Sequence, residues 1–320
     1  MVEARESNPL DAIPLGGAML TRREVLLVPV AVAAAQAADA QNAEPGKMLL
    51  SIHQNTSRGA GFQGSLEGWA RAGIRYVELN DGLLQTFLES NSLAAAGRVL
   101  TDNGLTPVCG VSGGADMWIP GPERAASLDR FRLRCEQYKT LGLNRVYTPS
   151  GTRRAVTADD FAETPRCIRE VGDIAQEFEL TAMIEFIRTS THLSTLTSAL
   201  ATIREAAHPH VNPMLDFFHF WSGLSKFQDL DLLRNGELQH CHFQDLLDTP
   251  RELIDNDSRL IPGDGIAPVD NILRKLKERG FTGALSVELF RAEYVDGDPY
   301  EVGLEIKQKC EAVMERAGVL

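Results

Sequence analysis

Four ionisable side chains stand inside otherwise apolar runs in the second half of the chain. They are Glu185 in MIEF, Asp216 in MLDFFH, His242 in HCHFQD and Glu288 in SVELF. A buried ionisable group without a partner is costly, and several gathered together would repel one another unless a cation lies among them. Each residue alone could be a satisfied core group or a helix N-cap. The set predicts a site for one divalent metal ion, with Mn²⁺ or Mg²⁺ preferred and Co²⁺ or Zn²⁺ as further candidates.

Alternating segments from residue 47 onward supply the elements that must position these groups. Short apolar runs predict strands, and stripes of apolar residues at helical spacing predict helices. We expect strands at 48–52, 74–79, 105–111, 144–149, 180–186, 211–217, 238–244 and 284–290. We expect helices at 64–72, 91–103, 122–141, 157–178, 194–207, 226–234, 268–279 and 299–317. Glycines at the helix-to-strand turns suit left-handed C-caps: Gly73, Gly104, Gly142, Gly236 and Gly280.

Eight successive strand–helix units predict a single (β/α)8 TIM barrel over residues 47–320, because about 250 residues is typical of that fold. A doubly wound open sheet is the alternative, but no GxGxxG follows the first strand. Active sites of such barrels lie at the C-terminal ends of the strands. The four ionisable residues end strands five to eight, so the barrel would bring them to one mouth.

Composition limits the class of partner. The formal net charge is −12, and no basic block occurs in the sequence. Nucleic acid and anionic membrane surfaces need clustered Lys and Arg, so we expect neither as a partner and favour a small molecule. The five cysteines are widely spaced, form no CxxC pair and are odd in number. We expect them to be buried and free rather than joined in a disulfide framework.

Residues 1–46 read as an export signal or an N-terminal extension. Arg22 and Arg23 precede an apolar Ala/Val run, and Ala38-Asp39-Ala40 resembles a small-residue cleavage site. This pattern is typical of twin-arginine export and predicts a periplasmic or exported protein. The run is too short and too weakly apolar for a membrane span. The alternative is a helix docked on the fold, in which case the protein would be cytoplasmic.

Several short motifs resemble the xylose isomerase-like barrel superfamily of sugar isomerases, epimerases and inosose dehydratases. The resemblance covers about residues 48–315. Its carriers are YVEL at 76–79, IEF at 184–186, Asp216 with His219, His242 with Asp245, GDG at 263–265 and SVEL at 286–289. It implies that Glu185, Asp216, His242 and Glu288 are the metal ligands and that His219 contacts a substrate hydroxyl or carbonyl. Relatives of this kind often form dimers or tetramers, so a homo-oligomer is compatible with it.

A metal in such a site predicts chemistry at carbons beside a carbonyl. A divalent ion polarises a carbonyl and acidifies the neighbouring C–H, and carboxylates on either side can remove and return the proton. We therefore expect a metal-dependent isomerase or epimerase acting on a keto-sugar through an enediolate, with Glu185 and Glu288 as the base–acid pair. One alternative is a lyase or dehydratase that eliminates from a 3-keto-glycoside or keto-cyclitol. Another is a non-catalytic sugar-binding barrel. The expected ligand is a small sugar or glycoside.

An AP endonuclease, which has the same barrel, is disfavoured. That chemistry uses three zinc ions and a basic DNA-binding face, whereas this chain has seven histidines and is acidic.

Substrate contacts are expected from residues near the strand ends. The candidates are His53, His219, Asp245, Trp118 and Arg188, with His192, Trp221 and Lys226 as further loop residues. The chain departs from the ketose 3-epimerases at two positions. Thr191 stands where those enzymes have a substrate-binding Glu, and Asp248 stands where they have an Arg, with Arg251 further on. These departures weaken the expectation of a free-ketohexose substrate.

Overall fold

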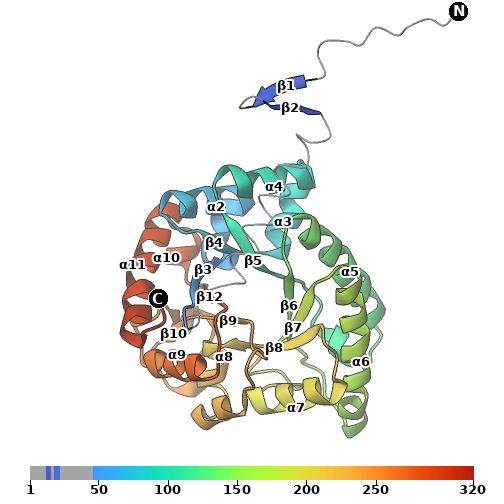
Figure 1. Ribbon diagram of the computed structural model, residues 1–320. Helices are drawn as coiled ribbons and strands as arrows, with labels where there is room; N and C mark the ends of the chain where they lie inside the picture. Colours follow the sequence, from blue (N-terminus) through green and yellow to red (C-terminus); the bar gives the residue numbers. More distant parts are fainter. Residues whose placement is uncertain (1–11, 16–17, 22–45) are drawn as a thin grey trace, which may run out of the picture.

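A closed barrel of eight parallel strands forms the centre of the protein, as seen in the computed structural model, which describes residues 12–15, 18–21 and 46–320 (Figure 1). Going round the barrel, every strand pairs with its neighbour in chain order, and the last pairs with the first. The strands are β3 (Leu49–His53), β4 (Tyr76–Leu79), β5 (Thr106–Val111), β6 (Arg145–Ser150), β7 (Thr181–Phe186), β8 (Val211–Asp216), β9 (His240–His242) and β12 (Ala284–Val287). The predicted TIM barrel is confirmed, and each predicted strand overlaps an observed one.

Helices surround the barrel on the outside (Figure 1). They are α2 (Gly61–Arg71), α4 (Leu93–Asp102), α5 (Arg124–Thr140), α6 (Ala158–Glu177), α7 (Leu196–Ala206), α9 (Val269–Glu278) and α11 (Pro299–Ala317). The predicted helix near 226–234 is the 3₁₀ helix η3 (Phe227–Leu232). All five glycines expected at helix ends have positive φ, between 63° and 87°, a backbone region that glycine enters at little cost.

Shorter elements at the mouth were absent from the sequence prediction. The 3₁₀ helix η1 (Gln54–Ala60) follows β3, and α3 (Asp81–Leu88) follows β4. The helix α8 (Phe217–Ser222) follows β8, and α10 (Ala292–Val295) precedes α11. Strands β10 (Asp245–Leu246) and β11 (Arg259–Leu260) form an antiparallel pair beyond β9. The 3₁₀ helices η2 (Ala115–Trp118), η4 (Arg251–Leu253) and η5 (Asn256–Ser258) lie in the connecting loops.

A continuous apolar layer lies between the barrel and its helices, with fully buried members such as Trp69, Phe131, Phe186 and Leu276. All five cysteines are buried and free, as expected. None of the helices in the described ranges is long and apolar enough to cross a membrane. Strands β1 (Ala12–Leu15) and β2 (Ala18–Thr21) form a small antiparallel pair. The arginine pair and the rest of the expected export signal, up to residue 41, lie outside the described residues.

Candidate metal centre

The four predicted ligands meet at the C-terminal mouth of the barrel. Glu185, Asp216, His242 and Glu288 each offer one ligand atom, and these atoms all lie within 4.8 Å of one another. The centre of the cluster is His242 Nδ1, which lies 3.0 Å from Glu185 Oε1 and 3.4 Å from both Asp216 Oδ2 and Glu288 Oε2. All four side chains are nearly or fully buried.

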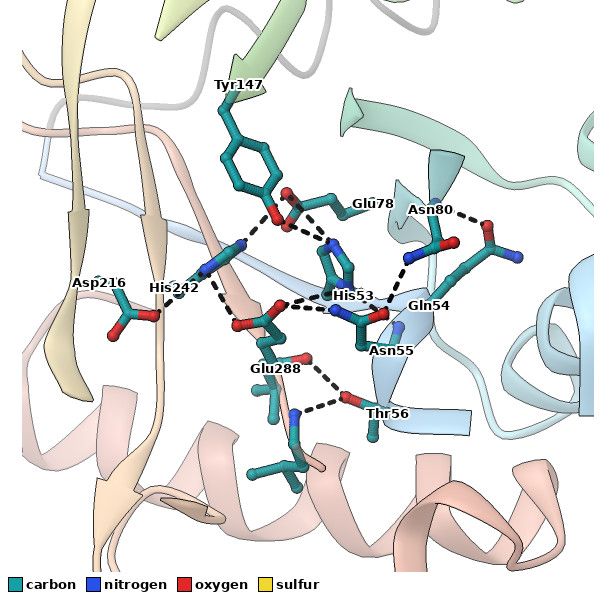
Figure 2. Close-up of polar contacts among 12 residues, drawn as sticks. His53, Gln54, Asn55, Thr56, Glu78, Asn80, Tyr147, Asp216, His242 and Glu288 are labelled. Carbon is teal, nitrogen blue, oxygen red and sulfur yellow. Dashed lines mark hydrogen bonds and ion pairs between the residues drawn. The ribbon is translucent and has the colours of Figure 1, made fainter. Parts of the chain in front are cut away.

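Neighbouring groups fix the ligand carboxylates. Asp216 ends β8 and caps α8: its Oδ1 accepts hydrogen bonds from the His219 backbone N–H (2.9 Å) and the Gln244 side chain (2.6 Å). This leaves Oδ2 facing the cluster. Glu288 Oε1 accepts a hydrogen bond from Asn55 Nδ2 at 2.8 Å (Figure 2). In both Asp216 and Glu288, therefore, one oxygen accepts hydrogen bonds from neutral groups and the other faces His242.

Arg259 is a buried cation beside the cluster that the sequence prediction missed. Its Nη1 lies 2.7 Å from Asp216 Oδ2 and 3.0 Å from Glu288 Oε2. The guanidinium lies over Phe218, 4.3 Å from the ring centroid, and 5.1 Å from that of Phe290. Cation–π contacts of this kind add to the ion pairs. Asp248 is exposed in its loop, and Arg251 donates to the Gly223 carbonyl instead.

Burial and mutual charge shift the pKa values of these groups. Burial raises the pKa of Glu185 to about 8, against the opposing attraction of His242. The pKa of Asp216 lies well below its usual range because the attraction of Arg259 and neighbouring histidines outweighs burial. The pKa of His242 is raised well above its usual value because the surrounding carboxylates, Glu288 foremost, outweigh burial. The raised pKa of His242 shows that the carboxylates favour a positive charge among them, which His242 and Arg259 provide in the metal-free protein.

His219 is a neutral imidazole at the rim. Burial lowers its pKa to about 4. Its Nε2 lies 3.3 Å from Arg259 Nη2. An arginine can only donate, so Nε2 accepts and the proton resides on Nδ1. That N–H has no hydrogen-bond partner among the described residues.

A cavity of about 550 Å³ opens onto this cluster, within the range of small-molecule sites. Two of the four predicted ligands, Glu185 and Glu288, line it. Its wall also includes Asn55, Tyr147, Arg188, His219, Arg259 and Phe290. A substrate in this cavity would reach the two carboxylates that were predicted as the base–acid pair.

The predicted substrate residues divide into two groups. Arg188 and His219 line the cavity. His53 is fully buried inside the barrel, with its Nε2 3.2 Å from the Tyr147 hydroxyl. Trp118 is fully buried in the apolar layer outside the barrel.

The carboxylate of Asp245 is occupied by the protein, because it accepts from the backbone N–H groups of Leu246, Gly263 and Ala267. We therefore remove Trp118 and Asp245 from the candidate substrate contacts. We keep His53 only as a buried residue that supports the side chains lining the cavity.

The further loop candidates also have structural partners. His192 is buried, with its Nε2 2.9 Å from the Thr164 hydroxyl. Trp221 packs with Phe218 in a small apolar cluster, and Lys226 begins η3. None of the three lines the cavity.

The donor set fits a divalent cation. Three carboxylates and one imidazole are a hard-to-borderline set, and their ligand atoms converge from four neighbouring strands. With His242 neutral, the three negative charges would be balanced by the +2 of the ion and the +1 of Arg259. Glu185, Asp216, His242 and Glu288 would therefore hold the ion, and Arg259 would complete the charge balance.

Comparisons with known proteins show the family and the fold. A family described as "Xylose isomerase-like TIM barrel" matches residues 66–310. An inosose isomerase from Bacillus velezensis is 27% identical over 192 residues, covering 59% of this chain and 69% of that protein. An inosose isomerase from Halalkalibacterium halodurans is 31% identical over 128 residues, 40% of this chain and 45% of that protein.

Among solved structures, the IolI protein with a bound zinc atom superposes with a TM-score of 0.78 at 23% identity, covering 84% of this chain and 99% of that chain. A D-allulose 3-epimerase from Methylomonas sp. superposes with a TM-score of 0.67 at 15% identity, covering 83% of this chain and 98% of that chain. These likenesses show a common fold. Because the family match spans most of the sequence, the chain belongs to the xylose isomerase-like TIM barrel family.

Proposed function

We propose that the chain is a divalent-metal-dependent isomerase or epimerase of a keto-sugar or keto-cyclitol, with Mn²⁺ as the preferred ion. The observation that carries the proposal is the convergence of the four ligands beside a cavity that two of their carboxylates line. The names of the relatives, inosose isomerases and sugar 3-epimerases, support the substrate class. The ion, when bound, polarises the substrate carbonyl and makes the adjacent C–H more acidic.

Proton transfer is the task of the protein's own residues. Glu185 lies on strand β7, and Glu288 lies just beyond the end of β12. Because these strands are not adjacent in the barrel, we expect the two carboxylates to approach a substrate in the cavity from different sides. One takes the proton from the carbon beside the carbonyl, and the other returns a proton to the same or the adjacent carbon. Arg259 and Arg188 are donors for substrate oxygens, and the unpartnered Nδ1–H of His219 is a third.

The decisive experiment is NMR of metal-loaded protein with a panel of inososes, keto-hexoses and 3-keto-glycosides in D₂O. We expect deuterium to enter beside the carbonyl. Glu288→Gln should keep the fold and reduce this exchange by at least about 100-fold, the usual range for losing a general acid or base. Glu315→Gln, at an exposed position of α11, is the matched control and should exchange at the wild-type rate.

Other outcomes would contradict the proposal in distinct ways. Release of an aglycone or of water would indicate an eliminating lyase. Tight sugar binding that survives Glu288→Gln, without exchange for any compound, would indicate a non-catalytic sugar-binding barrel.

A further inference from the structure

We infer that Glu78, on β4, is a positioning residue that holds His242 in the tautomer able to bind the metal. The inference rests on the metal site of the proposed function and concerns a residue outside the ligand set. Glu78 belongs to the YVEL motif, and its side chain is fully buried inside the barrel, next to the ring of His242 (Figure 2).

The two oxygens of Glu78 face two imidazoles. Oε1 lies 3.3 Å from His242 Nε2, and Oε2 lies 2.9 Å from His240 Nε2. An ionised carboxylate only accepts hydrogen bonds. The Nε2 atom of each imidazole must therefore carry a proton, and the Glu78 carboxylate joins the two rings by accepting from both.

This assignment decides which nitrogen of His242 is free. In the metal-free protein, His242 Nδ1 also faces a carboxylate, Glu185 Oε1 at 3.0 Å, and a bound ion would displace any proton between them. The imidazole of the metal-bound protein is then neutral, with one N–H and one lone pair. With the proton on Nε2, the lone pair is on Nδ1, which is the atom that lies 3.0–3.4 Å from the three ligand carboxylates. The opposite tautomer would aim an N–H at the ion and prevent coordination. Partners of this kind fix the ring orientation and tautomer of metal-bound histidines.

No other group in the described part of the chain competes for this role. Glu78 is the hydrogen-bond partner of His242 Nε2. Tyr147 meets the His242 ring edge-on, with centroids 5.1 Å apart, and its hydroxyl is turned to His53. His53 Nδ1 accepts from the Asn55 backbone N–H, so that ring also has a partner of its own.

The local strand geometry aims Glu78 at this position. The register between β4 and β5 shifts between Val77 and Glu78. Irregularities of this type re-aim a side chain next to active sites. His240 and His242 are two residues apart on β9, so both point into the barrel, and one carboxylate on the facing strand can reach both.

The first test needs no variant. We expect ¹⁵N NMR of histidine-labelled protein loaded with diamagnetic Zn²⁺ to show the His242 proton on Nε2. A proton on Nδ1 of the loaded protein would overturn the inference. Failure of the wild type to bind any divalent ion would instead contradict the proposed metal site itself.

The second test measures metal affinity by chelator competition, without substrate. Glu78→Gln has one acceptor oxygen in place of two, and a neutral one. We expect it to bind Zn²⁺ or Mn²⁺ about 10–100-fold more weakly. Cys310→Ala, a fully buried change on α11 outside the barrel, is the control and should keep wild-type affinity.

His240→Leu removes the second donor to Glu78 and leaves the contact with His242. His240→Leu should weaken metal binding by less than Glu78→Gln does. It replaces Glu78→Gln as the test variant if the Glu78→Gln protein does not fold. A folded Glu78→Gln protein, verified by circular dichroism, that binds metal within threefold of the wild type would refute the inference. So would a loss in Cys310→Ala equal to that in Glu78→Gln.

Discussion

In the metal-free protein, the positive charge of Arg259 balances negative charge on the buried carboxylates of the site. Its guanidinium pairs with Asp216 and Glu288 while all three side chains are buried. Removing one partner of a buried ion pair leaves an uncompensated charge, which typically costs about 3–5 kcal/mol. We therefore expect Arg259→Gln to lower the free energy of unfolding of the metal-free protein by about that amount in urea denaturation.

Arg188→Gln is the matched control for this prediction. Arg188 also lines the cavity, but it donates to the Ile254 carbonyl and forms no ion pair with a carboxylate of the described residues. Its loss should cost much less stability. Divalent metal should restore more stability to Arg259→Gln than to the wild type, because the ion replaces the missing positive charge. Equal losses in the two variants would contradict this account.

The sequence revealed the ligands because each is an ionisable group that interrupts an apolar strand. Arg259 gave no such signal. It lies in a polar stretch, 17 positions after His242, where the related pattern has its arginine after six. The antiparallel pairing of β11 with β10 brings Arg259 back to the site. A local stretch of sequence does not reveal this pairing. Glu78 was visible in YVEL, but its partners on β9 are about 160 residues away.

The strands and the long helices, in contrast, could be predicted closely from the spacing of apolar residues in the sequence. The predicted strands matched because parallel barrel strands are continuously apolar, and the long helices matched because each has one buried face. The short mouth elements α3 and α8 were missed because fewer than three turns hardly show a period. Their caps were nevertheless readable: Asn80 begins α3 by accepting from the Leu83 N–H, and Asp216 begins α8.

The loop after β7 yields a prediction about acid. His192 in this loop is fully buried, and its ring contacts the Thr164 hydroxyl on α6. Burial lowers its pKa from 6.5 to about 4 in the folded protein. The unfolded chain therefore binds the proton first as pH falls, so stability should decrease between pH 6.5 and 4, by up to about 3 kcal/mol from this residue.

Urea unfolding of the wild type and of His192→Gln across this pH range tests the prediction. Glutamine can keep a hydrogen bond to Thr164 but does not titrate. The difference in the free energy of unfolding between the two proteins should therefore shrink by about this amount from pH 7 to pH 4. A difference that is independent of pH would show that His192 protonates equally well in both states.

At the scale of the whole molecule, the four ligands come from four consecutive positions around the barrel: β7, β8, β9 and the end of β12. A bound ion would join these strands next to the place where β12 closes the barrel on β3. Binding to the folded state alone stabilises a protein by about 2.7 kcal/mol when the free ligand is 100 times its Kd. For a barrel of this size, that corresponds to a rise in Tm of roughly 4–5 °C.

Differential scanning calorimetry at increasing Mn²⁺ should therefore show a rising Tm, and a chelator should return it to the metal-free value. Asp216→Asn removes one negative ligand and keeps an oxygen to cap α8, so the rise should be much smaller in this variant. Glu315→Gln should behave like the wild type. If Mn²⁺ raised the Tm of Asp216→Asn as much as that of the wild type, the stabilising ion would be bound elsewhere, and the strand-end cluster would not be the metal site.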